Sequence, residues 1–207
     1  MFLGMISEAC KKSFKANVEE ITKMSVAGFA SENPRVRFEA MQATGLLLND
    51  LAPTVQVKFH QDLVPQFVQM MNNEQHLKMQ TQATACMTSF IRGFLEDFEE
   101  EEGDSENKKL LLPYADQIVE SIAALFEKSV KEKYQPLQDE VLVTLSCLAS
   151  LMEDSFAAHY GKFMPGLKNI LQNTKWDTEQ EQELRSNCTE CVGYILTSVK
   201  DKPEVCK

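Results

Sequence analysis

Glycine and proline are scarce in this chain. Its 207 residues include only eight Gly and seven Pro, far fewer turn formers than loop-rich or all-β folds usually need. Long basic runs are also missing, because Lys and Arg cluster at most in pairs such as Lys11-Lys12 and Lys108-Lys109. Neutralising phosphates requires clustered positive charge, so direct nucleic-acid binding is not expected.

Membrane and export signals are missing from the sequence as well. No uninterrupted apolar run approaches the roughly 18 residues that cross a bilayer, and residues 1–6 are too short for a secretory signal. We therefore predict no membrane association. The six cysteines fall mostly within apolar helical patterns, which predicts reduced core residues of a cytosolic or nuclear protein.

The residue patterns of catalysis and metal binding are likewise not found. His60, His76 and His159 are isolated in the sequence, and no nucleophile with a base and an orienting acid can be assigned. Cys188-x-x-Cys191 lacks the second pair of ligands that a zinc site needs, so helix packing is the favoured interpretation over a metal or redox site. We predict no enzyme activity, no cofactor and no metal.

Helix-forming residues dominate instead, and they are organised as a repeat. In one kind of segment two apolar residues precede a proline and a helical apolar pattern. These segments are 62–71, 109–126 and 162–171, with Pro65, Pro113 and Pro165. In the other kind, small residues and Thr are mixed with bulky apolar ones. These segments are 39–51, 79–94, 139–154 and 184–199. Proline is tolerated in the first turn of a helix, so each of the three is expected near a helix start.

The spacing between the two kinds of segment exposes an insertion. Thr44 to Pro65 and Thr144 to Pro165 are both 21 residues apart, whereas Thr84 and Pro113 are 29 apart. The excess coincides with the acidic stretch 96–107, in which Glu96 to Glu106 holds eight acids. Without those eight, 23 acidic residues face 21 basic ones, so the net charge of −10 belongs largely to this stretch.

Two interpretations of the acidic insertion remain open. Like charges repel and favour disorder, which predicts a flexible, solvated turn between two helices. The alternative is an electrostatic contact with a basic partner. Its contact residues would be Glu99, Glu100, Glu101, Glu102 and Asp104.

Helix pairs that recur every 40 to 47 residues are typical of HEAT or armadillo arrays. Armadillo units usually show a glycine at an extra turn, and no regular one occurs, so HEAT is favoured. We predict an all-α HEAT-repeat solenoid, with antiparallel helix pairs stacked into a superhelix as one continuous segment. Neither end shows a polar capping repeat, which predicts a fragment of a longer array. The expected repeats are 1–30 (partial), 33–73, 76–130 (with the insertion 96–107), 134–174 and 179–207 (partial).

Several stretches in order along the chain resemble the importin-β superfamily, and within it the karyopherin beta-three class. These are LGMISEAC, NPRVRFEAMQATG followed by LAP, KFHQDLVPQFVQMM, LLLPYADQIVESI, HYGKFMPGLKNIL and LRSNCTECVGYI. The acidic insertion departs from the family pattern, in which the link before LLLPYADQIVESI is short.

The resemblance implies a nuclear transport receptor that acts by binding. Such receptors take cargo with lysine-rich nuclear localisation signals on a concave face and release it when Ran binds in its GTP form. The concave face is lined by the second helix of each pair, which here is the proline-containing kind of segment, and the threonine-containing kind is the first helix. They pass the pore by binding phenylalanine-glycine nucleoporins between first helices. The chain would then shuttle between cytoplasm and nucleus as a monomer. The alternative is a HEAT scaffold or a phosphatase regulatory subunit with no transport role.

Polar residues of the second helices are the candidate cargo-binding residues. Amides can hydrogen-bond an extended peptide backbone, and carboxylates can pair with lysine. The alternative is that these polar residues form the ordinary solvated face of amphipathic helices and bind no ligand. The candidates are Gln66, Gln69, Asn73, Asp116, Glu120, Asn169, Gln172 and Asn173. A separate structural role, satisfying helix ends and neighbouring acids, is expected of the first-helix residues Arg37, Asp50, Arg92 and Arg185.

Overall fold

The regular elements of the described residues are all helical. The structure is a computed structural model, and it describes residues 11–95, 104–202 and 205. The α-helices are α2 (Lys11–Ala16), α3 (Val18–Ala27), α4 (Pro34–Asp50), α5 (Thr54–Asn73), α6 (Leu77–Leu95), α7 (Asp104–Glu132), α8 (Gln135–Met152), α9 (Tyr160–Asn173) and α10 (Glu179–Ser198). Two short 3-10 helices are η1 (Gly28–Ala30) and η2 (Glu153–His159).

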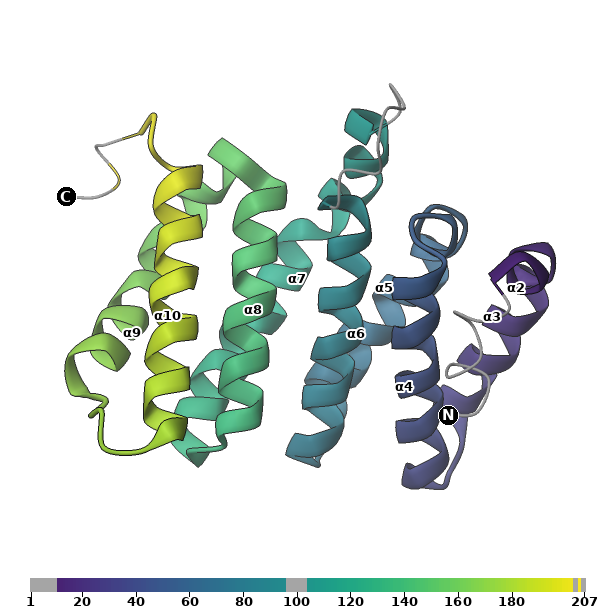
Figure 1. The fold of residues 1–207 in the computed structure, drawn as a ribbon, viewed down its shortest axis with the longest axis horizontal. Helices are drawn as coiled ribbons and strands as arrows, with labels where there is room; N and C mark the ends of the chain where they lie inside the picture. The colour runs from purple at the N-terminus through teal and green to yellow at the C-terminus, as the bar shows by residue number, and fades with distance from the viewer. Residues whose placement is uncertain (1–10, 96–103, 203–204, 206–207) are drawn as a thin grey trace. The chain divides into compact units, whose positions relative to one another are not determined.

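The chain divides into two compact units, residues 1–111 and 112–207, and the boundary falls within α7. In the first unit α4 and α6 lie side by side, with α3 and α5 in a second layer behind them (Figure 1). In the second unit α8 and α10 form one layer, and α9 and the later part of α7 form the other. Each unit thus has a layer of first helices (α4, α6; α8, α10) and a layer of second helices (α3, α5; α7, α9).

Local sequence explains where two of the first helices begin. The side chain of Asn33 accepts a hydrogen bond from the backbone N–H of Arg35, and Pro34 occupies the first turn of α4. At α10, Thr178 and Glu181 form a capping box, in which each side chain accepts a hydrogen bond from the other's backbone N–H. These contacts satisfy donors that the first turn of a helix leaves without partners.

Three prolines are not where the sequence predicts them. Pro65, Pro113 and Pro165 lie inside α5, α7 and α9, not near the helix starts. Residues 54–64 and 104–112 already form helix before Pro65 and Pro113. In 54–64 the buried Val55, Phe59 and Leu63 keep the helical spacing. All three prolines are exposed, so the carbonyl that each deprives of a helical partner is on the solvent side.

Helix α7 is longer at both ends than the sequence suggests. It starts at Asp104, so 104–107 of the insertion 96–107 are helical and not a loop. Asp and Ser favour helix starts, and acids near a helix N-terminus interact well with its dipole. Glu99, Glu100, Glu101 and Glu102 lie outside the described residues. At its other end α7 continues past the predicted helical segment 109–126 to Glu132.

Phenylalanines form the centre of each core. In the first unit, Phe29, Phe67, Phe90 and Phe94 follow one another with ring centroids 5.6 to 6.4 Å apart. In the second unit, Phe163 lies between Phe126 and Phe156, at 6.5 and 6.2 Å. Large rings at these separations contribute both buried apolar area and favourable edge contacts.

Buried glutamines fasten successive helix pairs together. Gln80 of α6 donates to the carbonyl of Met71 at the end of α5 (2.7 Å), and Gln138 of α8 donates to that of Ser129 in α7 (3.1 Å). Each is the fourth residue of its helix and each reaches nine residues back. The last carbonyls of a helix have no partner within the helix. The same type of hydrogen bond, from a buried glutamine to such a carbonyl, therefore occurs between α5 and α6 and between α7 and α8.

By length and hydropathy alone, one helical stretch in the described residues, Gln135–Asn173, could cross a membrane. Of its most apolar window, 56% is buried inside the fold. A buried core helix meets the same criteria, so this stretch carries no argument for a membrane.

Candidate functional site

Three of the predicted cargo-binding residues line one hollow. Gln66, Gln69 and Asn73 follow one another at helical spacing on α5 and border a hollow of about 470 Å³. The remaining lining residues are Phe29, Ala30, Arg37, Met70, Glu74, Gln75 and His76. Side-chain amides therefore dominate the polar lining, and an amide can both donate and accept hydrogen bonds.

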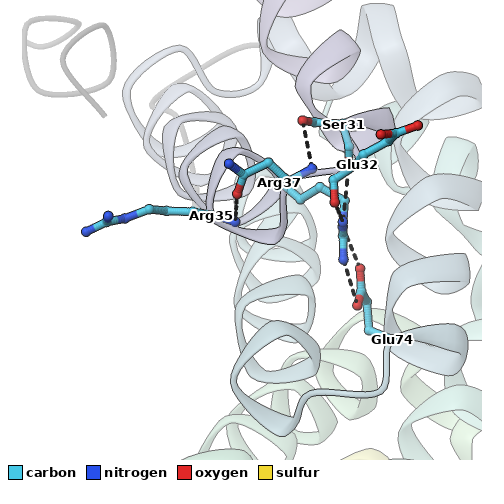
Figure 2. A network of polar contacts seen from close by, with 6 residues as sticks. Ser31, Glu32, Arg35, Arg37 and Glu74 are labelled. Carbon is cyan, nitrogen blue, oxygen red and sulfur yellow. Dashed lines mark hydrogen bonds and ion pairs between the residues drawn. The ribbon is translucent and has the colours of Figure 1, made fainter.

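An ion pair forms one wall of this amide hollow. The guanidinium of Arg37 donates from Nε to Oε1 of Glu74 (2.9 Å) and from Nη2 to Oε2 (3.3 Å), as Figure 2 shows. Its Nη1 donates to the backbone carbonyls of Ser31 (3.0 Å) and Glu32 (3.2 Å). Arg35 points away from this network.

This network ties three segments together. The side chains of Arg37 and Glu74 are only 20% and 15% exposed, so the pair is well shielded from water. Arg37 of α4 thereby holds the end of α5 and the chain segment after η1. The expected structural role of Arg37 is confirmed.

A second hollow adjoins the first along α5. It has a volume of about 280 Å³, lies between α3 and α5, and also includes Gln66. Its lining is mainly apolar, with Thr22, Lys23 and Asp62 as the other polar residues. The hydroxyl of Thr22 is buried and has no hydrogen-bond partner among the described residues.

Sequence reasoning missed Thr22, Lys23 and Asp62. Asp62 could have been found, because it lies one helical turn before Gln66 on the same face of α5. Thr22 could not, because a single threonine in a helix carries no signal of its own.

In the second unit the predicted acids have partners in η2 and α9. An oxygen of Asp116 lies 3.1 Å from Nε2 of His159, and the ammonium of Lys162 donates to Glu120. The two acids are exposed, at 86% and 66% of their side-chain surface. His159 and Lys162 were missed, although they follow the acids by 43 and 42 residues, which is one repeat length.

The remaining candidates lie at the end of α9. Asn169, Gln172 and Asn173 are exposed, and the amide of Asn173 donates to the side-chain oxygen of Asn169. The candidates therefore fall into three groups, the hollow on α5, the acids of α7 and the amides of α9. Whether any of them contacts a ligand stays a prediction.

Arg185 also has the expected structural role at a helix end. Its Nη1 donates to the carbonyls of Leu171 and Thr174, where α9 finishes. The guanidinium stacks on the ring of Trp176, 4.5 Å from the ring centroid. For Asp50 and Arg92 the polar role stays a prediction.

Cys188 and Cys191 are buried packing residues, as the sequence predicts. Burial raises the pKa of the Cys188 thiol to about 11 and that of Cys191 to about 12. Both thiols are therefore protonated at neutral pH and are poor nucleophiles. Across the residues that the structure covers, no group of three metal-binding side chains comes together.

No protein-family model matches the chain. Among curated proteins, importin subunit beta-3 of Saccharomyces cerevisiae is 23% identical over 195 residues, which are 94% of this chain and 16% of that protein. The resemblance to the importin-β superfamily is confirmed. The chain spans about a sixth of that importin's length.

Solved structures of the karyopherin Kap121p have the same fold. Kap121p bound to Pho4p matches with a TM-score of 0.77 and 21% identity, over 99% of this chain and 18% of that chain. Kap121p bound to Nup53p matches with a TM-score of 0.76 and 22% identity, over the same shares. A Kap121p mutant with three acidic residues changed to lysine is also similar, with a TM-score of 0.77 and 20% identity over those shares. The predicted all-α HEAT-repeat fold is confirmed.

Proposed function

We propose that this chain is a segment of a nuclear transport receptor and that its second helices bind the localisation signals of cargo proteins. The observation that carries the proposal is the similarity to an importin over 195 residues of this chain. Structures of the similar Kap121p bound to Pho4p and to Ste12p support a role in binding other proteins.

The amide hollow suits the backbone of an extended peptide. From Gln66 to Asn73 the helix rises about 10 Å, which is the length of about three extended residues. Gln69 lies between them, so three amides follow the direction of such a peptide. Amide side chains can pair with backbone N–H and C=O groups whatever the peptide sequence.

The acids of α7 suit the side chains of a basic signal. Asp116 and Glu120 are exposed carboxylates one helical turn apart, and a lysine ammonium can pair with either. Asn169, Gln172 and Asn173 would add backbone contacts on α9. Together these groups would favour lysine-rich signals, with the amides supplying affinity and the acids selectivity.

The proposal extends to the transport cycle of the whole receptor. Cargo would bind the concave side of the array, and Ran in its GTP form would shift the receptor to a state that releases it. Phenylalanine-glycine nucleoporins would bind on the side of the first helices. The receptor would shuttle through the nuclear pore.

Binding of a fluorescein-labelled lysine-rich peptide, followed by fluorescence anisotropy, tests the central step. A matched peptide with each lysine changed to glutamine is the control. We expect binding of the lysine peptide that weakens as salt rises, because salt screens the exposed ionic contacts of its lysines with Asp116 and Glu120. Equal binding of both peptides, or of neither, would favour the scaffold alternative over a transport receptor.

A further inference from the structure

Each of the two acids that α7 exposes has a side-chain partner in the same chain. Asp116 is paired with His159 and Glu120 with Lys162, both at the junction of η2 and α9. Lysine is the permanent cation of the two, since a histidine is charged only when protonated. The carboxylate of Glu120 therefore already has a lysine ammonium as its partner.

We infer that Lys162 is a specificity-determining residue, because its ammonium competes with the lysine of a bound peptide for Glu120. This inference rests on the proposed function, in which the acids of α7 receive basic side chains. Lys162 then acts as an internal counter-ion that an incoming lysine must displace.

Packing between α7 and α9 keeps Lys162 near its partner. The ring of Phe163, the next residue, is fully buried and lies 6.5 Å from that of Phe126. A Cβ on Gly166 would come within 2.4 Å of the Phe126 ring, so only glycine allows this approach of α9 to α7. The backbone of Lys162 is therefore fixed beside α7 before any ligand arrives.

Solvent exposure makes the contact displaceable. The side chain of Glu120 is 66% exposed and that of Lys162 is 35% exposed. Exposed ion pairs are weak, so an intermolecular lysine can replace the internal one. Because the pair is weak, its removal should tighten binding of a lysine-rich peptide only about two- to fivefold.

The test compares two variants of the full 207-residue chain. Lys162→Met removes the internal counter-ion and keeps the apolar stem. Lys168→Met is the matched control, because Lys168 is exposed on the same helix and six residues on, which places it on a different face of α9. Circular dichroism confirms that each variant is folded, and anisotropy measures the Kd of the fluorescein-labelled lysine-rich peptide at low salt.

We expect Lys162→Met to lower that Kd about two- to fivefold and Lys168→Met to lower it less. In a Glu120→Gln background the gain from Lys162→Met should disappear. Equal effects of the two lysine changes, or a gain that persists with Glu120→Gln, would overturn the inference while leaving the proposed function in place. If the unaltered chain and both variants bind neither lysine nor glutamine peptide, the proposed function fails and the inference with it.

Discussion

Helix α5 of the first unit and the later part of α7 in the second unit are both second helices, but they present their polar groups differently. On α5 uncharged amides line a hollow, and the nearby charges of Arg37 and Glu74 are paired and shielded from water. On α7 the charges themselves are exposed, and they are paired with His159 of η2 and Lys162 of α9. Under the proposed function, the second helix of one unit would recognise a peptide backbone and that of the other would select for charge.

The ion pair beside the amide hollow should show the largest effect on stability. Arg37→Ala removes a bidentate contact and leaves Glu74 shielded without its cation, so we expect unfolding free energy to fall by about 2–3 kcal/mol. Urea unfolding followed by circular dichroism measures this loss. Arg35→Ala, two residues earlier and pointing away from the network, should cost less than about 0.5 kcal/mol. Equal costs would show that the network stabilises nothing.

The buried glutamines Gln80 and Gln138 test whether successive helix pairs are held together in the same way in both units. Gln80→Leu and Gln138→Leu each remove a buried hydrogen bond to a helix-end carbonyl. The expected loss of unfolding free energy is about 1 kcal/mol for Gln80→Leu and smaller for Gln138→Leu, because the carbonyl of Ser129 keeps the backbone N–H of Tyr134 as a donor. Urea unfolding is again the measurement. The exposed Gln117 of α7, changed to Leu, is the control and should cost almost nothing. A fall in unfolding free energy for only one of the two variants would mean that the two hydrogen bonds do not contribute in the same way.

Peptide binding should separate the amides from the acids. The triple change of Gln66, Gln69 and Asn73 to Ala should weaken binding of both the lysine and the glutamine peptide, because backbone contacts are lost. About tenfold is expected for three hydrogen bonds of modest net strength. The pair Asp116→Asn and Glu120→Gln should weaken only the lysine peptide. Fluorescence anisotropy measures the Kd of each labelled peptide for each variant. If both variants lose affinity for the two peptides in the same proportion, the proposed separation of backbone-binding amides from lysine-binding acids is wrong.

The buried thiols of α10 should have the smallest effect, confined to alkaline solution. Their ordinary pKa is 9.0, and burial raises it to about 11 in Cys188 and about 12 in Cys191. The unfolded chain therefore releases these protons first, so stability is unaffected below pH 9 and falls as pH rises from 9 towards 11. Urea unfolding across this range measures the decline. Cys188→Ala should make it shallower, and an equally steep decline in that variant would refute this origin.

Much of the helix pattern could be predicted because it rests on local spacing. The recurring threonine and proline segments indicated paired helices, and α4, α6, α8 and α10 contain the four threonine segments or most of their residues. The prolines inside helices could not be placed, since local sequence does not show how many turns precede Pro65. The pairs of Asp116 and Glu120 join residues about one repeat apart, and only the packing of α7 on α9 shows which of them meet.

The interior prolines make the second helices easier to bend than the first helices. A proline has no N–H to donate, so α5, α7 and α9 each lack one rung of the helical hydrogen-bond ladder, opposite Gln61, Lys109 and Gly161. Bending at that rung breaks no further backbone bond, whereas α4, α6, α8 and α10 have no proline beyond their first turn. Compliance is therefore concentrated in the layer that carries the candidate ligand contacts, and the first helices form the stiff side of each unit.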